Sequence, residues 1–504
     1  MLDWFADLAD IAIVVYSIGI VSSYIAMLIM AGHMHRRHKT YHDEQHTIEA
    51  MRHSPYTPSV SIVAPAYNEE KTIITSVLSL LSLDYPDYEV IIVNDGSKDS
   101  TLQLLIDHFS LVKIPYAYIE KIKTNPVRGV YKTSTDNPVF RRLVVVDKEN
   151  GGTKADASNA GVNIVTSSYF VCTDVDCILD KLALYRIIWP TMTSSRRIIA
   201  VSASMRMSNG CDVRNGQMVE AKAPRALIPL FQDLEYTRSY LIGKTAFASI
   251  NAMQNVSGGF GLFDTEIVIK AGGYDGESFA EDMDMIARMV RYMCDADEDY
   301  RIVQLPETCC WTEGPSTLKV LARQRMRWGR GLLQFFGVHR DMIFNRNYRQ
   351  FGMITLPYIM IFELLAPAIE FSGYAVIISL FVSGAINYHT IWIVFLALFS
   401  FAQMLTMSII SFDIYVGNAF KKKSEYFRFF LASVLEPFLY HPLNVYFSLR
   451  GYLKQILGLR MVWGNMTRKG FAQPQAPVIP GSAQEEEEVT LEAEASAEKE
   501  VGDA

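Results

Sequence analysis

Apolar and polar residues divide this chain into two kinds of region. Residues 60–307 alternate short apolar runs with helical stretches, whereas residues 11–30, 353–382, 390–416 and 427–449 form long, largely apolar segments. The alternation predicts an α/β domain with a mostly parallel sheet and helices on both faces. The long segments are candidate membrane helices, since about 20 residues at ~1.5 Å each span a ~30 Å hydrocarbon core.

The charges beside these segments predict their orientation. Residues 11–30 lack the cleavage site of a signal peptide, which indicates a retained anchor. The basic stretch 33–39 follows directly and places the next domain in the cytoplasm. Residues 421–423 and 451–471 are also basic, so we expect an even number of crossings after Phe351. Either the first long segment after Phe351 crosses twice, or the last one lies along the membrane surface.

Three acidic residues interrupt the later apolar segments, namely Glu363, Glu370 and Glu436. Ionisable groups at membrane depth are expensive and usually face a cavity or protein. These glutamates are therefore candidates for a polar passage. A position at the interface beside helix breaks explains them equally well.

The length of the chain limits the number of domains, and its net charge is concentrated in one segment. A chain of 504 residues has room for two or three domains. The net charge of −7 belongs to the tail, because nine acidic residues and one lysine follow Gln484 and the remainder is close to neutral. The Pro, Ala and Glu content of the residues after Gln473 predicts that this tail is disordered. The six cysteines show no pairing or zinc pattern, and we interpret them as reduced cytosolic thiols.

Polar clusters follow four of the predicted strands, and ligands of such sheets bind at the carboxyl ends of strands. These clusters are residues 65–69, 94–97, 151–156 and 174–176. Each alone is ordinary turn or cap chemistry. Together they describe a nucleotide site with a tyrosine for the base, acids for base or ribose, a lysine for phosphate and two carboxylates for a divalent ion. Oxygen ligands suit Mg²⁺ or Mn²⁺.

The motifs resemble those of the inverting family-two glycosyltransferases. Residues 93–101, 150–156 and 174–176 carry the first part of the resemblance, and Phe279–Asp284 resembles the catalytic-base motif. Thr312–Pro315 and then Gln324–Trp328 resemble the Gln-x-x-Arg-Trp region of membrane polysaccharide synthases, which include cellulose, hyaluronan and poly-N-acetylglucosamine synthases. The resemblance covers about residues 60–336 and implies an A-type glycosyltransferase domain flanked by transmembrane helices.

The resemblance also implies a role for each matching residue. The roles are uridine binding by Tyr67, Glu69 and Asp95; a place near the nucleotide for Lys154 and Asp156; contact with the nucleotide side for Asp174; the metal ligand Asp176; the general base Asp282; and contact with diphosphate and acceptor sugar for Gln324, Arg327 and Trp328. Thr153 is inserted before Lys154 relative to the family pattern, which leaves the register of that lysine open.

Elementary chemistry agrees with these roles. An inverting transfer needs a base for the acceptor hydroxyl, and a carboxylate supplies about 10²–10⁴-fold. Asp282 lies between Glu281 and Asp284, and neighbouring negative charge raises a carboxylate pKa. An acidic cluster that favours a helix N-terminus is the alternative. Arg327 with a metal can neutralise the leaving diphosphate, and Trp328 offers a flat face to a sugar, or else is an interfacial tryptophan.

Two further segments complete the predicted site. Residues 231–247 alternate apolar and charged positions, which predicts an amphipathic helix that rests on the membrane or closes the site. Residues 255–261 are rich in glycine, so their backbone can approach a ligand closely. We expect them on the acceptor side, and a simple tight turn is the alternative.

The leading hypothesis is an inverting hexosyltransferase that adds sugar from a UDP-sugar donor to a growing β-linked polysaccharide and passes the product through its own helices. A single-addition enzyme with a lipid-linked acceptor and a catalytically silent binding subunit are the alternatives. We expect a bacterial inner (plasma) membrane protein with a cytoplasmic catalytic domain. Its expected partners include membrane lipid and export or regulatory subunits, and no nucleic acid.

The expected organisation follows from these boundaries. It consists of a transmembrane anchor (1–33), a basic linker (34–58), a cytosolic glycosyltransferase domain (59–336), interface and transmembrane helices (337–450), a basic cytoplasmic segment (451–472) and a disordered acidic tail (473–504).

Overall fold

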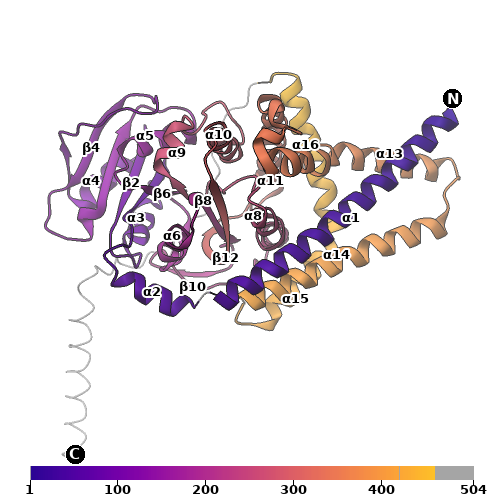
Figure 1. Cartoon of the computed structure of the whole chain (residues 1–504), viewed down its shortest axis with the longest axis horizontal. Helices are drawn as coiled ribbons and strands as arrows, with labels where there is room; N and C mark the ends of the chain where they lie inside the picture. The colour runs from indigo at the N-terminus through magenta and orange to yellow at the C-terminus, as the bar shows by residue number, and fades with distance from the viewer. Residues whose placement is uncertain (1, 42, 419, 460–504) are drawn as a thin grey trace, which may run out of the picture. The chain divides into compact units, whose positions relative to one another are not determined.

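The computed structural model describes residues 2–41, 43–418 and 420–459 (Figure 1). The predicted acidic tail and most of the predicted basic segment before it lie outside the described residues. The division into six domains therefore stays a prediction.

A ten-stranded mixed sheet carries the predicted α/β domain, in the order β3-β4-β5-β2-β1-β6-β11-β8-β12-β7. Its strands are β1 (Val60–Ala66), β2 (Tyr88–Asp95), β3 (Leu111–Ile114), β4 (Val127–Thr133), β5 (Leu143–Lys148), β6 (Tyr169–Thr173), β7 (Ile178–Leu179), β8 (Arg197–Met207), β11 (Phe260–Asp264) and β12 (Tyr300–Thr312); a separate hairpin joins β9 (Asp212–Arg214) and β10 (Gln217–Glu220).

The predicted parallel pairing holds at the centre of the sheet. β1 pairs in parallel with β2 and β6, and β2 pairs in parallel with β5. The strands toward the edges, such as β4 and β11, pair antiparallel with their central neighbours. The carboxyl ends of β5, β2, β1 and β6 therefore meet at one edge, which brings together the polar clusters that follow them.

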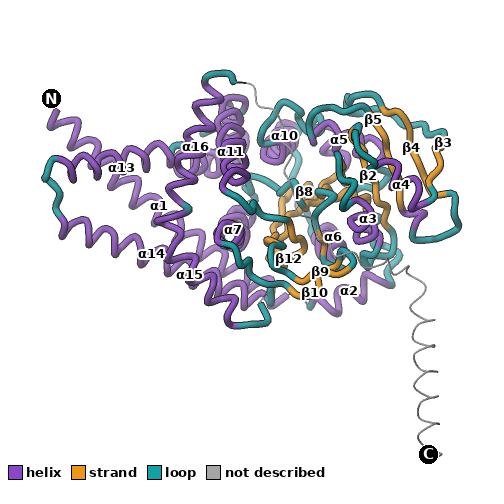
Figure 2. Tube along the Cα trace, turned by 180° about the vertical axis from the view of Figure 1, so that it is seen from behind, coloured by secondary structure: helices purple, strands orange, loops and turns teal. Residues whose placement is uncertain are grey.

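Alternating side chains of the central strands form two cores, one on each face. Val63 and Val93 belong to the core under α5 (Lys154–Ile164), α9 (Thr265–Lys270) and α10 (Glu281–Asp295). The core on the other face lies under α3 (Ile73–Leu81), α4 (Thr101–Phe109) and α6 (Ala183–Thr193). Figures 1 and 2 show helices on both sides of the strands. Burial of each aliphatic side chain contributes roughly 1.5–3 kcal/mol.

Close packing fixes α5 against the sheet. A Cβ atom on Gly161 would lie 2.4 Å from Val63 Cγ1, so only glycine allows this approach. Thr153 caps the helix, because its hydroxyl accepts a hydrogen bond from Asp156 N. The inserted threonine thus makes Lys154 the first residue of α5.

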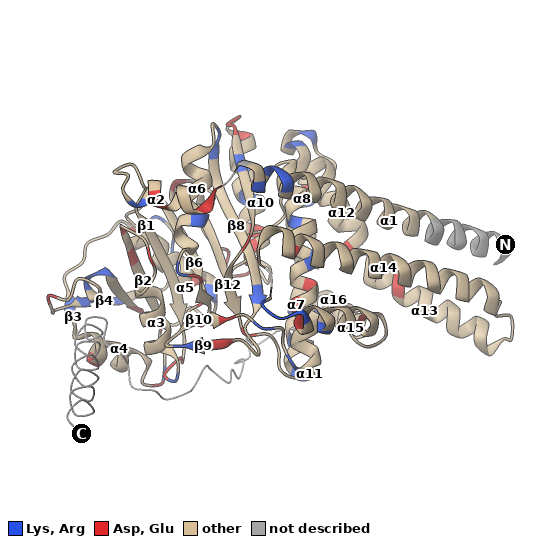
Figure 3. Ribbon diagram, turned by 90° about the horizontal axis from the view of Figure 1, so that it is seen from below, with Lys and Arg blue, Asp and Glu red and all other residues tan. Residues whose placement is uncertain are grey.

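Three helices among the described residues are long and apolar enough to cross a membrane, namely Val15–Thr40, Phe351–Val382 and Tyr388–Val416. The first belongs to α1 (Leu2–Tyr41), which continues through the basic stretch; α2 (Glu44–Arg52) follows. The second includes α12 (Leu356–Ile359) and α13 (Ala366–Val382), and the third is α14 (Tyr388–Val416). Figure 3 shows few charges on α13 and α14. Two candidate spans after Phe351 agree with the even number expected.

The last apolar segment forms two helices, α15 (Lys423–Leu439) and α16 (His441–Ile456). A helix covers the predicted range, as α7 (Leu227–Arg238), a π-helical turn (Ser239–Lys244) and α8 (Thr245–Ser249). The polar Gln232 and Asp233 of α7 are buried together with its apolar residues, so the predicted amphipathic division of its faces is not observed. α7 packs between β8 and α15, and α16 packs on α11 (Leu318–Val338). α7 is thus enclosed by protein on these two sides.

A buried charge cluster joins this part of the sheet to α14. Arg206 at the end of β8 donates to Asp233 of α7 at 3.1 Å and to Asp413 of α14 at 3.1 Å. All three side chains are buried. Two predicted passage residues are also paired: Arg238 donates to Glu436 at 2.7 Å, and His441 lies 2.6 Å from Glu370.

Candidate active site

The loops after β2 and β5 build the first part of the site around Asp95. The Asp95 carboxylate is buried and accepts hydrogen bonds from Lys148 Nζ at 2.9 Å and from Gly151 N at 3.0 Å. Asn150 Nδ2 donates to the Asp95 carbonyl at 2.7 Å. Gly96 adopts φ +62°, and a Cβ there would lie 2.8 Å from Asn150 N, so the turn requires glycine.

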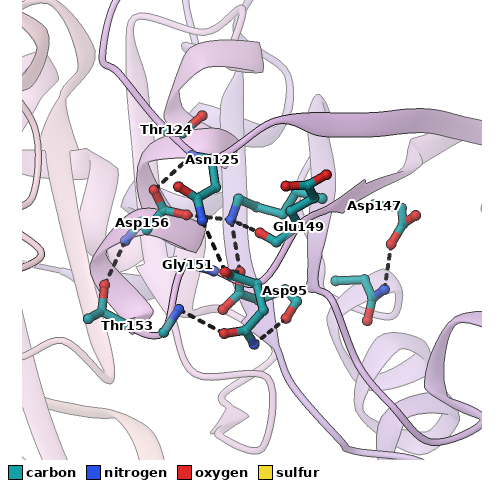
Figure 4. A network of polar contacts seen from close by, with 12 residues as sticks. Asp95, Thr124, Asn125, Asp147, Glu149, Gly151, Thr153 and Asp156 are labelled. Atoms are coloured by element: carbon teal, nitrogen blue, oxygen red, sulfur yellow. Dashed lines mark hydrogen bonds and ion pairs between the residues drawn. The ribbon is translucent and has the colours of Figure 1, made fainter.

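Lys148 is a central residue that the sequence did not single out. Its side chain is fully buried and forms ion pairs with both Asp95 and Asp156. Figure 4 shows Asp95, Gly151 and Asp156 converging in this network. Asp156 also accepts from Asn125 N at 3.1 Å. Asp156, predicted near the nucleotide, is therefore engaged by Lys148. The only signal was that Lys148 ends a strand beside Asp95, which depends on the pairing of β2 with β5.

Tyr67 and Glu69 follow β1 at the same edge of the sheet. The Tyr67 side chain is 38% exposed, so its ring is available to a ligand. Glu69 is held in the loop, because its backbone N donates to Thr101 Oγ1 at 2.9 Å and its carboxylate accepts from Thr72 Oγ1 at 2.9 Å. The uridine roles of Tyr67, Glu69 and Asp95 remain predictions.

Asp174, Asp176 and Cys177 form a group that could hold a metal ion. One ligand atom from each residue lies within 4.8 Å of the others. Two carboxylates suit Mg²⁺ or Mn²⁺, so the donor set fits the divalent ion that the sequence predicts. Cys177 was not predicted as part of this group, although it directly follows Asp176.

Lys154 reaches the same group from the start of α5. Its Nζ lies 2.5 Å from Asp174 and donates to the Gly258 carbonyl at 2.7 Å. Burial alone would lower the pKa of Lys154, but the Asp174 carboxylate raises it, so the lysine is a permanent cation. The sequence left its register open, and the structure places it beside the predicted metal ligands.

The three acids of the predicted base motif have separate surroundings at the start of α10. Asp282 accepts from Met283 N at 2.9 Å and from Asn255 Nδ2 at 3.3 Å. Asp284 is buried and turns away to His339, at 2.8 Å. Burial raises the pKa of Glu281, which Arg327 lowers and the Asp282 charge raises further. Asp282 is thus the member of the motif that the glycine-rich segment contacts.

The glycine-rich segment connects the two sides of the site. Its Gly258 carbonyl binds Lys154 beside the metal group, and its Asn255 side chain binds Asp282. A Cβ on Gly259 would lie 2.6 Å from Met205 Cε, so the turn is also tightly packed. Both interpretations made from the sequence, a ligand-lining segment and a tight turn, are compatible with this geometry.

The Gln324–Trp328 segment lies on α11 beside the base. Arg327 donates to the Phe279 carbonyl at 3.1 Å and lies 3.7 Å from Glu281. Gln324 Oε1 is buried and has no hydrogen-bond partner among the described residues. Trp328 is half-buried, and the Arg325 guanidinium lies over its ring at 4.4 Å from the centroid. Sequence reasoning missed Arg325, whose partners are distant in the chain.

Comparisons with known proteins agree with the predicted family. The model of Glycosyl transferase family 2 matches residues 61–124, and that of Glycosyl transferase family group 2 matches residues 225–410. The first range contains Asp95, and the second contains Asp282 and Trp328. The resemblance to family-two glycosyltransferases is therefore confirmed.

The chain is also similar to poly-beta-1,6-N-acetyl-D-glucosamine synthases. It is 26% identical over 272 residues to one from Staphylococcus epidermidis, which covers 54% of each chain. It is 27% identical over 308 residues to one from Staphylococcus aureus strain COL, which covers 61% of this chain and 62% of that protein. The chain thus spans less than two thirds of the length of these curated relatives.

A solved structure supports the fold. A mannosyltransferase from Pyrobaculum calidifontis, solved in complex with GDP-Man and Mn²⁺, superposes with a TM-score of 0.51 at 16% identity. The match covers 86% of this chain and all of that one. The predicted fold class, an α/β glycosyltransferase domain with flanking apolar helices, is confirmed.

Proposed function

We propose that this chain, a relative of family-two glycosyltransferases, is a membrane-embedded inverting hexosyltransferase. It transfers sugar from a UDP-sugar to a growing β-linked polysaccharide, adds sugars processively and passes the product through its membrane helices. The observation that carries this proposal is the continuous line of contacts from Asp174 through Lys154 and Gly258 to Asn255 and Asp282. It sets a cation and metal-binding carboxylates on one side and a hydrogen-bonded carboxylate on the other.

Each group has a separate task in this reaction. Asp282 takes the proton of the acceptor hydroxyl as that oxygen attacks the anomeric carbon from the side opposite the diphosphate. Lys154 and Arg327 place positive charge where the leaving diphosphate gains negative charge. Asp176, with Asp174 beside it, would hold Mg²⁺ or Mn²⁺, which when bound neutralises the diphosphate as a Lewis acid.

The residues on α11 indicate how the acceptor sugar binds, and the basic stretch before the catalytic domain indicates where in the cell that domain lies. Trp328 stacks on the acceptor sugar, and Gln324 supplies a hydrogen-bond acceptor near it. The names of the similar synthases favour N-acetylglucosamine as the sugar. We place the chain in the bacterial inner membrane with the catalytic domain in the cytoplasm, since the basic stretch 33–39 precedes that domain.

Replacement of Asp282 by Asn tests the base directly. We expect transfer to fall by about 10²-fold or more while UDP affinity stays within about twofold, because the amide cannot take a proton. Mass spectrometry of products made from a panel of UDP-sugars, with GDP-mannose as a comparison, identifies sugar and chain length. Unchanged turnover in Asp282→Asn would refute the base, and a single-sugar lipid product would refute processivity.

A further inference from the structure

A polar cluster next to Trp328 joins α7, α11 and the α15–α16 junction; its Arg325 and Tyr440 are buried, and the Glu235 side chain is 32% exposed. Arg325 of α11 donates to both carboxylate oxygens of Glu235 of α7, at 2.7 and 2.5 Å. It also donates to the hydroxyl of Tyr440, at 2.5 Å, and that hydroxyl donates to Glu235 at 2.9 Å. Tyr440 is the residue between α15 and α16. The cluster therefore closes a triangle among α7, α11 and the α15–α16 junction, which we call the Arg325 clamp.

The Arg325 clamp fixes the plane of a guanidinium that lies over an indole ring. Two parallel hydrogen bonds to one carboxylate define the orientation of a guanidinium, which a lysine ammonium could not reproduce. Arg325 is only 6% exposed, so its attraction to the Trp328 ring is little screened. Because Arg325 covers one face of the ring, a sugar can stack only on the opposite face.

The neighbouring motif residue has a different task. Arg327 contacts the loop before the base, through the Phe279 carbonyl and Glu281. Arg325 has no such contact and directs its donors toward α7 and Tyr440. The two arginines of one motif thus have separate partners: Arg327 contacts the loop before the base, and Arg325 lies over the Trp328 ring and contacts α7 and Tyr440.

We propose that Arg325, held by Glu235 and Tyr440, positions the Trp328 ring for the acceptor sugar and couples acceptor binding to the α15–α16 junction. Arg325 is a positioning residue, since it acts through Trp328. The inference rests on the proposed function and adds to it a link between sugar binding and the helices through which the product would leave.

Steady-state kinetics with an oligosaccharide acceptor test the clamp. In Arg325→Lys and Glu235→Gln we expect the acceptor KM to rise about tenfold, the size of one desolvated cation–π contact, with donor KM and UDP affinity within about twofold. Tyr440→Phe keeps the ring and removes one hydrogen bond, so we expect about a threefold rise. If Arg325→Lys and Glu235→Gln do not fold, Tyr440→Phe tests the clamp by itself.

Asp264→Asn is the matched control. It weakens another two-point ion pair with a buried carboxylate, that of Arg197 with Asp264 at 2.7 and 3.0 Å, which joins β8 to the end of β11. We expect its acceptor KM to stay within about twofold. An equal rise in Asp264→Asn, or an unchanged acceptor KM in both Arg325→Lys and Tyr440→Phe, would overturn the clamp.

Binding without turnover separates this inference from the proposed function. Quenching of tryptophan fluorescence by the oligosaccharide, compared in Asp282→Asn and in Asp282→Asn combined with Arg325→Lys, should show the same tenfold loss. A wild-type chain that transfers no sugar contradicts the proposed function, and the quenching still decides the clamp. Equal quenching in the two proteins contradicts the clamp alone.

Discussion

The two sides of the site, which we propose to bind the donor and the acceptor and name accordingly, hold buried charge in different ways. On the donor side, Lys148 is fully buried between Asp95 and Asp156, and all three come from one stretch of strands and loops. On the acceptor side, Lys244 is also buried, at 4% exposed, yet it has no ion-pair partner among the described residues. Its Nζ lies over the Tyr240 ring at 4.5 Å.

This difference indicates which half of the site pairs its buried charges without help from the later helices. The donor half pairs Lys148 and Lys154 with carboxylates within the α/β domain. The acceptor half contains a lysine held by an aromatic ring and an arginine clamp that depends on α15 and α16. A buried ionisable group with a shifted pKa, such as Lys244, is a frequent feature of functional regions.

The largest effect is expected when the donor cluster is broken. Lys148→Met leaves Asp95 and Asp156 as uncompensated buried charges, which costs about 3–5 kcal/mol of folding free energy. Thermal unfolding in detergent measures this loss. The exposed Lys98→Met is the control, expected within about 0.5 kcal/mol of wild type. Equal stability of the two variants would mean that the donor half is not held by this cluster.

Replacement of Lys244 should stabilise the protein, whereas replacement of Lys148 should destabilise it. Burial lowers the pKa of Lys244 from 10.5 to about 8, against the pull of the Asp282 charge. Between these two pH values the unfolded chain binds more protons, so native stability rises with pH. The penalty is full below pH 8, where it amounts to about 3 kcal/mol, and is absent above pH 10.5.

Lys244→Met should therefore stabilise the protein by about 3 kcal/mol at pH 7, with the gain gone near pH 10.5. Unfolding of both proteins at pH 7, 9 and 10.5 checks the sign. A gain that does not change with pH would show that Lys244 carries no buried charge.

The smallest expected loss of stability comes from removing a helix cap, which can be done once on each side of the site. Thr153 caps α5 and Thr317 caps α11, each by accepting from a backbone N–H at 3.4 Å. Replacement of either by Ala should cost about 1 kcal/mol of stability. Only Thr153→Ala should weaken UDP binding, because Lys154 is the first residue of α5. Weakened UDP binding in Thr317→Ala would contradict the separation of the two halves.

The sequence predicted those features that depend on local pattern. The polar clusters at residues 94–97 and 174–176 that follow strands were predicted from the apolar runs before them, and the α/β class follows from the alternation of these runs with helical stretches. The acidic base motif and the Gln324–Trp328 motif were found by resemblance. The structure joins these segments at one edge of the sheet and beside α11.

The features that sequence reasoning missed depend on distant contacts. Lys148 needs the β2–β5 register to meet Asp95, and Arg325 needs Tyr440, which is 115 residues away. Asp156 stays a predicted neighbour of the nucleotide, and its ion pair with Lys148 could not be predicted without that pairing. Cys177 was interpreted only as one of six reduced thiols, because its position near the two carboxylates depends on the turn after β6.

The Arg206 cluster also sets an order for biosynthesis. Arg206 and Asp413 are 207 positions apart in the chain, and a ribosome makes the arginine first. Arg206 pairs with two carboxylates, Asp233 and Asp413. Until α14 has been synthesised, Asp413 is absent and Arg206 can pair with Asp233 alone. Arg206 therefore gains both carboxylate partners only after α14 has been synthesised, so the buried pairing that joins the sheet to α14 forms late in biosynthesis.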